Sequence, residues 1–540
     1  MTFYRLALPA LALLPAALFG AAPPRVAPRV PLHQRIDELI AAKSADFAKF
    51  DAGLASDAEI FRRLHLDLIG RIPTSVDARA FLADRTPTKR TALIDKLLAS
   101  PEHARHMADV FDVMLMERQA SALVPQVEWH EFLRRSFLAN TPYDVMVREI
   151  LSCDDADPKT RYRAKFILDR AADPHRVTRD LARLFLGMNL QCAQCHDHPL
   201  NEDWKQDHYY GLFAFVSRTT LVPDRVAKTS RLAEKADGEV SFQSVFDPRK
   251  VTKTSLPRAP FGPALPDILV DKAKPYILVP AVGVASRPKY SRRARLADAV
   301  ARGDYVPFRR NIANRLWAKM MHRGLVEPMD RDSLVNPPSH PELLELLADD
   351  IAASEFDMRS FLRELALSRT YQRSSERPAG DRDGPLYSTA ILAPLTPEQL
   401  GWSLIQATGL METHRLSLGT KATEEAMVAR LGGLIPTFTR VFGGNPGEAQ
   451  TFDARMDQAL FLANGGTVRS WLVSRQGSLL ARLEKLSGVA LADELYLSIF
   501  TRLPDDEERK EVADFLARRP KALADLAWGL MASTEFRFNH

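Results

Sequence analysis

Apolar residues recur at helical spacing over most of this chain. Phe308, Ile312, Leu316 and Met320 return every fourth residue and predict one face of a buried helix. Tyr209, Leu212, Phe213 and Val216 follow the same rule. Helical periodicity covers residues 33–217 and returns in the last 240 residues or so. The pattern predicts two all-helical regions.

Capping residues predict where several of these helices begin and end. A Ser, Thr or Asp before the first turn can accept a hydrogen bond from a free backbone N–H, and Pro is tolerated at the first helical position. Arg323-Gly324 supplies a cation and a glycine stop. The predicted starts are Ser56-Asp57-Ala58-Glu59, Ser100-Pro101, Asp173-Pro174, Ser339-His340-Pro341-Glu342 and Thr396-Pro397-Glu398-Gln399.

The segment between the helical regions has a different pattern. Prolines are frequent from Thr219 to Lys289, and Val240-Ser241-Phe242 alternates in the manner of a strand. We therefore predict a mainly α fold, in which helical domains at 33–217 and 301–540 are joined by a small β-containing, proline-rich segment at 218–300.

The N-terminus has the three parts of a secretory signal peptide. Arg5 precedes the apolar run Leu6 to Phe19, and the small residues Gly20-Ala21-Ala22 follow. The run is shorter than the roughly 20 residues that cross a bilayer. We predict a signal peptide at 1–22, a proline-rich linker at 23–32, and an exported, periplasmic or envelope-associated protein with no transmembrane segment in its mature chain. An uncleaved anchor or a buried helix is the alternative.

Composition describes an ordinary globular protein with no nucleic-acid partner. Of the 540 residues, 46% are hydrophobic and 26% charged. The net charge of +5 is spread along the chain, whereas a nucleic-acid groove needs clustered Lys and Arg with stacking aromatics. Three cysteines are too few for a disulfide framework, so the closely spaced pair at 192 and 195 is expected to have a specific role.

That pair belongs to Cys192-Ala193-Gln194-Cys195-His196, a haem c attachment motif. Two thiols add across the porphyrin vinyl groups, and the adjacent imidazole reaches the iron as the proximal ligand. With three Cys and 13 His in the chain, an accidental match is expected roughly four times in ten thousand. Haem is attached to such motifs outside the cytoplasm, in agreement with the predicted signal peptide. The sequence thus predicts one covalent haem c.

Other uses of the cysteines stay open at this point. A redox-active pair normally opens a helix, whereas this pair is predicted to close the helix that begins at Asp173-Pro174, whose apolar stripe ends at Met188. A disulfide between Cys192 and Cys195 is a second possibility. Zinc could use Cys192, Cys195 and His198, although no second cysteine pair supplies further ligands.

The remaining histidines leave the opposite face of the iron unassigned. His198 is only two residues from His196, so it would lie on the same side of the porphyrin. Candidates for a sixth ligand are His208, His175, His130 and Met188, and an open position would permit peroxide chemistry. His103, His106 and His340 are expected to be structural. No motif of a hydrolase, phosphate loop, dinucleotide site or zinc protease is present, so catalytic residues stay unknown.

Six stretches of the sequence carry a family resemblance: Phe61 to Thr74, Leu184 to Phe215, Asn311 to Pro328, Asn336 to Leu344, Ser368 to Gln372 and Ser533 to His540. They resemble the planctomycete cytochrome c-type domain (domain of unknown function 1549) followed by its companion planctomycete-specific domain (domain of unknown function 1553). Together they span nearly the whole mature chain. The resemblance implies an exported haem protein and includes His198 in the motif, which suggests that His198 holds the loop or forms a hydrogen bond near the haem.

These observations predict a c-type haem protein in electron transfer, or the redox partner of an unidentified periplasmic enzyme. Two other classes remain: a non-haem scaffold or interaction protein with a Cys192–Cys195 disulfide or a metal site, and a haem enzyme such as a peroxidase.

Overall fold

The computed structural model describes residues 30–199, 201–268, 272–377, 384–444 and 455–539. The predicted signal peptide at 1–22 and most of the linker at 23–32 lie outside these ranges. Within them, no helix has both the length and the apolar character required to cross a membrane.

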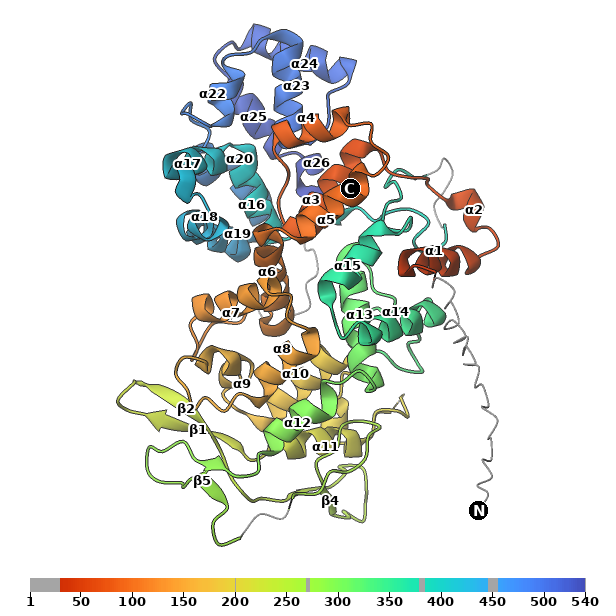
Figure 1. Ribbon diagram of the computed structural model, residues 1–540, viewed down its shortest axis with the longest axis vertical. Coiled ribbons are helices and arrows are strands. Elements are labelled where there is room, and N and C mark those ends of the chain that lie inside the picture. The colour runs from red at the N-terminus through yellow and green to blue at the C-terminus, as the bar shows by residue number, and fades with distance from the viewer. Residues whose placement is uncertain (1–29, 200, 269–271, 378–383, 445–454, 540) are drawn as a thin grey trace, which may run out of the picture.

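The described residues form a mainly helical protein, which confirms the predicted fold class (Figure 1). The first helical region contains α1 (Leu32–Ala42), α2 (Phe47–Phe50), α3 (Asp57–Ile69), α4 (Ser75–Ala83), α5 (Lys89–Leu98), α6 (Pro101–Met116), α7 (Gln126–Leu138), α8 (Tyr143–Ser152), α9 (Lys165–Leu168), α10 (Pro174–Leu186) and α11 (Gln206–Val216), with short 3₁₀ turns η1 (Arg161–Ala164) and η2 (Cys192–Gln194).

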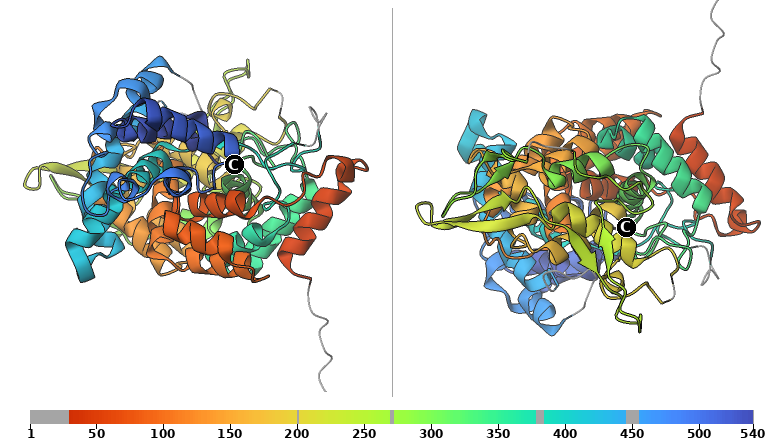
Figure 2. Two further views of the ribbon diagram at one scale, coloured as in Figure 1. Left: turned by 90° about the horizontal axis from the view of Figure 1, so that it is seen from above. Right: turned by 90° about the horizontal axis from the view of Figure 1, so that it is seen from below.

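Small antiparallel strand pairs follow α11, as the proline-rich segment predicted. β1 (Thr219–Asp224) pairs with β2 (Thr229–Glu234), β3 (Val240–Phe242) with β4 (Lys253–Ser255), and β5 (Tyr276–Leu278) with β6 (Arg287–Pro288). Figure 2, seen from below, places these strands in front of the helices. The alternation Val240-Ser241-Phe242 puts two side chains inside and one outside.

Helices resume with α12 and continue to the C-terminus. They are α12 (Arg292–Val300), α13 (Val306–Met321), α14 (Pro341–Ala353), α15 (Met358–Leu367), α16 (Pro397–Ala407), α17 (Leu410–Leu418), α18 (Glu424–Leu431), α19 (Ile435–Phe442), α20 (Met456–Asn464), α21 (Gly466–Arg469), α22 (Leu479–Leu483), α23 (Gly488–Ile499), α24 (Asp506–Arg518), α25 (Leu523–Met531) and α26 (Thr534–Arg537), with 3₁₀ turns η3 (Gly419–Lys421) and η4 (Gly432–Leu434). β7 (Ala393–Pro394) pairs with β8 (Phe538–Asn539).

The predicted helix starts are present, but the capping box predicted at Ser339-His340-Pro341-Glu342 is absent. Ser100 and Asp173 cap α6 and α10, and Thr396 forms the full capping box of α16. α14 begins at Pro341, and its N-cap residue His340 makes no side-chain cap hydrogen bond; the His340 ring lies against Tyr387 and its Nδ1 contacts Ser339. α13 ends before the glycine stop that was predicted at Gly324. Its last residue is Met321, and His322 takes the left-handed conformation (φ 58°) in place of Gly324.

The described chain has two hydrophobic cores, which change over near residue 390. The first core contains buried residues from Leu32 to Tyr387, including α12 to α15, together with Leu497 of α23; the second contains residues of α16 to α26 together with Leu66 and Ile72. Figure 1 shows the second group at one end of the long axis and the strands at the other. α3 serves both cores, because Leu64 and Leu68 pack in the first and Leu66 in the second.

The C-terminal end of α3 is buried and capped from several directions. The last four carbonyls of a helix lack intrahelical partners and carry the negative end of its dipole, so buried ones need donors. Burial lowers the pKa of His103 to about 4 and keeps that ring neutral. Gln399 Nε2 donates to the carbonyl of Leu66 (2.9 Å), and Lys319 Nζ donates to that of Asp67 (2.8 Å). His103 Nδ1 donates to the carbonyl of Leu68 (2.8 Å), and Arg105 donates to that of Ile69 (2.5 Å).

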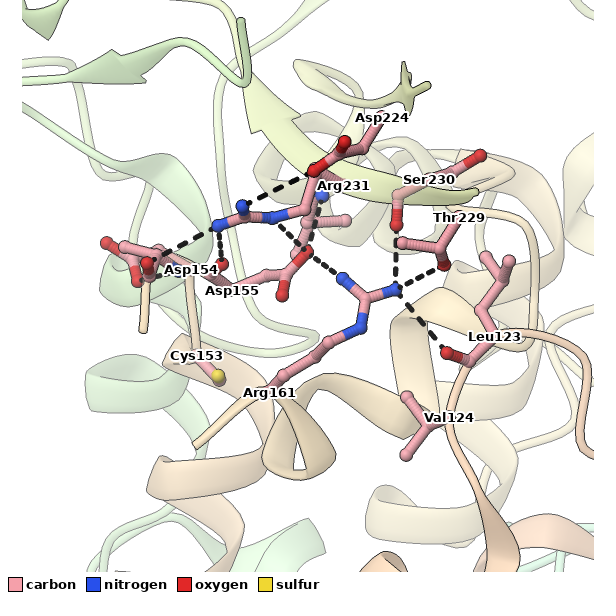
Figure 3. Close-up of polar contacts among 12 residues, drawn as sticks. Leu123, Val124, Cys153, Asp154, Asp155, Arg161, Asp224, Thr229, Ser230 and Arg231 are labelled. Atoms are coloured by element: carbon pink, nitrogen blue, oxygen red, sulfur yellow. Dashed lines mark hydrogen bonds and ion pairs between the residues drawn. The ribbon is translucent and has the colours of Figure 1, made fainter. Parts of the chain in front are cut away.

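A buried carboxylate fastens the β1–β2 hairpin to the first helical region (Figure 3). Asp155 is fully buried, and its Oδ2 lies 2.5 Å from Arg161 and 3.4 Å from Arg231 of β2. The same oxygen accepts the backbone N–H of Leu232 at 2.9 Å. Arg161 also donates to the carbonyl of Ser230 (2.7 Å). The hairpin is therefore held through charged side chains and backbone groups together.

Candidate functional site

The Cys-x-x-Cys-His segment lies between α10 and α11. Asp173 accepts the N–H of Arg176 (2.8 Å) at the start of α10, as predicted. The helix ends at Leu186, where Gly187 takes the left-handed conformation (φ 68°). A Cβ at Gly187 would lie 3.2 Å from Asn311 Oδ1 of α13, so glycine also permits this close approach. The chain then turns toward the cysteines.

Cys192 to Gln194 form the 3₁₀ turn η2, which presents the two thiols to solvent. The carbonyl of Cys192 accepts the N–H groups of Cys195 (3.2 Å) and His196 (3.3 Å). Cys192 and Cys195 are both exposed, and neither is in a disulfide. Buried Ala193 anchors the turn, and Tyr210 Oη of α11 donates to the carbonyl of Gln194 (3.0 Å).

The hydrogen bonding of His196 decides which ring nitrogen is available to a metal. Its Nδ1 lies 2.7 Å from the carbonyl oxygen of Asp197. Because a carbonyl only accepts, Nδ1 carries the proton and, in the neutral ring, Nε2 keeps its lone pair. Metal-binding histidines commonly donate their second N–H to a carbonyl in this way, which fixes the tautomer. His196 is half-buried.

The residues after His196 brace the loop that leads to α11. Asp197 Oδ1 accepts the N–H of Gln206 (2.8 Å) at the start of that helix. The N–H of His198 donates to the carbonyl of Trp204 (2.9 Å), and the two rings meet edge to face at 5.3 Å. His198 is therefore placed to hold the loop. Its contribution to a haem site stays a prediction.

The candidates for a sixth iron ligand are dispersed. His175 Nδ1 lies 2.7 Å from Tyr209 Oη. Burial lowers the pKa of His208, whose ring packs against Phe261. No sixth ligand is assigned. The other two candidates have partners elsewhere: His130 pairs with Asp109 (2.8 Å), and Met188 is buried in the first core.

Two known protein families match separate stretches of the chain. Residues 35–220 match PSCyt2, a protein of unknown function (DUF1549), and residues 292–516 match PSD1, a protein of unknown function (DUF1553). The chain therefore contains a PSCyt2 region followed by a PSD1 region. This order confirms the resemblance found in the sequence. No curated protein and no solved structure matched the chain.

The cysteine motif lies in the PSCyt2 region, and other parts of the chain contact the motif or the helix before it. Asn311 Nδ2 of the PSD1 region donates to the carbonyl of Leu184 in α10 (2.8 Å). Residues 221–291 are matched by neither family, and their Val245 donates to the carbonyl of Cys195 (3.0 Å). The sequence did not predict these contacts, because each joins residues far apart in the chain.

Two further features of the described residues concern ligand binding. Among the residues that the structure describes, no three His, Cys, Asp or Glu side chains are grouped so that they could hold a metal ion, including the zinc set predicted from Cys192, Cys195 and His198. A cavity of about 1080 Å³ lies between α3 and the C-terminal helices, away from the motif. Its lining includes Glu59, Arg377, Phe500, Arg502 and Glu535.

Proposed function

We propose that this protein is an exported c-type haem protein that holds one haem through Cys192, Cys195 and His196 and transfers electrons to or from a periplasmic enzyme. The observation that carries the proposal is the arrangement of His196: its Nδ1 is bound to a carbonyl, and it lies directly after two exposed, free thiols. Exposed thiols can react with a prosthetic group, whereas buried cysteines are inert.

The residues present fit the chemistry of haem attachment. Cys192 and Cys195 supply the thiols for two thioether bonds, and Nε2 of His196 supplies the proximal nitrogen. Asp197 orients that ring through its backbone carbonyl, and Tyr210 holds the turn through Gln194. Haem, when bound, supplies one-electron chemistry whose potential the ligand and its surroundings set.

The proposal is tested on the full chain expressed with its signal peptide in a host that matures cytochromes c. We expect periplasmic protein with the reduced absorption bands of haem c, and reversible one-electron reduction. Cys192→Ala with Cys195→Ala should abolish covalent haem. Cys153→Ala is the matched control, because Cys153 is half-buried, away from the turn, and should leave the haem in place.

Two results would overturn the proposal. One is wild-type protein that leaves the maturing host without haem, with Cys192 and Cys195 joined in a disulfide. The other is protein that stays in the cytoplasm while a cytochrome control is exported. Rapid reaction of the haem protein with peroxide would retain the haem site but replace electron transfer by enzyme chemistry.

A further inference from the structure

The β3–β4 hairpin packs directly on the cysteine motif. Its loop residue Val245 donates a backbone hydrogen bond to the carbonyl of Cys195 (3.0 Å). The carbonyl of Gln243 accepts from Gln206 Nε2 of α11 (3.1 Å). At the hairpin's base, Phe242 stacks on Tyr210 at 4.3 Å with nearly parallel rings. The hairpin is thus fixed to the motif itself and to α11, the helix that follows it.

Phe246, at the start of the loop between the strands, touches His196. The two ring centroids are 4.5 Å apart with an interplanar angle of 37°. The other side of Phe246 faces outward, since 73% of the residue is exposed. A large aromatic side chain that is exposed on one side and packed on a candidate metal ligand on the other suggests a role at the site.

We propose that the β3–β4 hairpin is part of the haem site and that Phe246 is the positioning residue of His196. This inference rests on the proposed function and assigns a role to a segment that neither family match covers. The second torsion of a histidine side chain has broad, weakly separated minima, so a half-exposed imidazole is not held by its own rotamer preferences. The Asp197 carbonyl restrains the ring at Nδ1, and Phe246 restrains its plane.

Phe261 offers a matched control for this contact. It is also exposed (61%), and its ring lies 4.7 Å from that of His208. Phe246→Ala should therefore loosen His196 and spare His208, whereas Phe261→Ala should do the reverse. Val245→Ala tests the neighbouring position of the same loop and retains the backbone hydrogen bond to Cys195.

The first measurement uses the apoprotein, so that it does not depend on haem. Histidine modification by diethylpyrocarbonate is followed by peptide mass spectrometry. We expect Phe246→Ala to raise the modification rate of His196 several-fold, with wild-type rates in Phe246→Trp and Val245→Ala. Equal rates for His196 in wild type and Phe246→Ala, or a general rise at all exposed histidines, would overturn the proposal.

The second measurement uses the matured haem protein. The haem methyl resonances of the oxidised state report the orientation of an axial imidazole, and the reduction potential reports its bonding. Phe246→Ala should change both, and Phe246→Trp and Val245→Ala should not. If wild type carries no haem, the proposed function fails while the apoprotein result still decides the positioning role. If wild type carries haem and Phe246→Ala leaves resonances and potential unchanged, the positioning role fails alone.

Discussion

Replacing Asp67 by Asn should strongly destabilise the protein, because Asp67 is the buried carboxylate that joins α3 to the C-terminal half. Its side chain is fully buried. Oδ2 accepts from Tyr371 Oη and Oδ1 from Asn539 Nδ2, both at 2.9 Å. Lys319 Nζ lies 3.7 Å and His322 Nε2 3.6 Å from Oδ1. Four side chains from distant parts of the sequence therefore converge on one charge.

The size of the loss follows from these contacts. Breaking a buried ion pair by removing one partner costs about 3–5 kcal/mol, since the other charge stays buried. An asparagine keeps the shape but presents an N–H₂ group to at least one donor, and the charge-assisted bond lost there, worth about 1.5–3 kcal/mol, is part of this cost. We expect Asp67→Asn to lower the free energy of unfolding by about 3–5 kcal/mol.

Urea unfolding followed by circular dichroism measures this loss. Asp95→Asn is the control, because Asp95 pairs with Arg363 at 2.6 Å but both side chains are exposed by more than a third. Such pairs contribute less than about 1 kcal/mol. Equal, small effects of the two substitutions would refute the reasoning that buried charges at α3 tie the two cores together.

The pH dependence of the stability that Asp67 contributes gives a second check. Burial raises the pKa of Asp67, but the nearby His322 and Lys319 lower it by more, so the net pKa lies below 3.8. A carboxylate with a lowered pKa in the folded state stabilises fully above its unfolded pKa and loses this contribution as the pH falls through its folded pKa. The stability difference between wild type and Asp67→Asn should therefore be constant near neutral pH and shrink below about pH 4.

Two further substitutions test the fold. Gly70→Ala should destabilise the protein by several kcal/mol, because Gly70 is left-handed (φ 73°) and a Cβ there would lie 2.3 Å from Nδ1 of His106; a thermal midpoint equal to that of wild type would contradict this. Asp155→Asn should release the β1–β2 hairpin from Arg161 and Arg231, seen as faster amide exchange and proteolysis in that hairpin; unchanged exchange there would show that packing alone holds it.

Local sequence signals predicted helix starts well but not the connections between distant segments. The cap at Ser100 and the capping box at Thr396 involve residues three apart, so the sequence contains the whole interaction. His340 had the same local signal, yet its ring packs on Tyr387, and that contact depends on tertiary structure. The division of the hydrophobic cores near residue 390 had no local signal either.

At the candidate site, too, local sequence signals do not predict contacts between distant segments. The grouping of Cys192, Cys195 and His196 in one short stretch could be predicted, since the three lie within five residues of the sequence; their role as a haem site stays a prediction. The tautomer of His196 and its contact with Phe246 could not, because they depend on the peptide geometry after the motif and on a hairpin 50 residues later. The start of the helix before the motif was predicted correctly, but the cysteines do not close it: α10 ends at Leu186, where Gly187 turns the chain, and the separate turn η2 presents the cysteines.

The most direct test of the account is the mass of the proteolytic peptide that contains Cys192 to His196, taken from protein matured in a cytochrome-producing host. The account predicts one haem bound covalently to this peptide, with Cys153 unmodified on its own peptide. A peptide from the same preparation that carries two free thiols or a disulfide, and no haem, would contradict it.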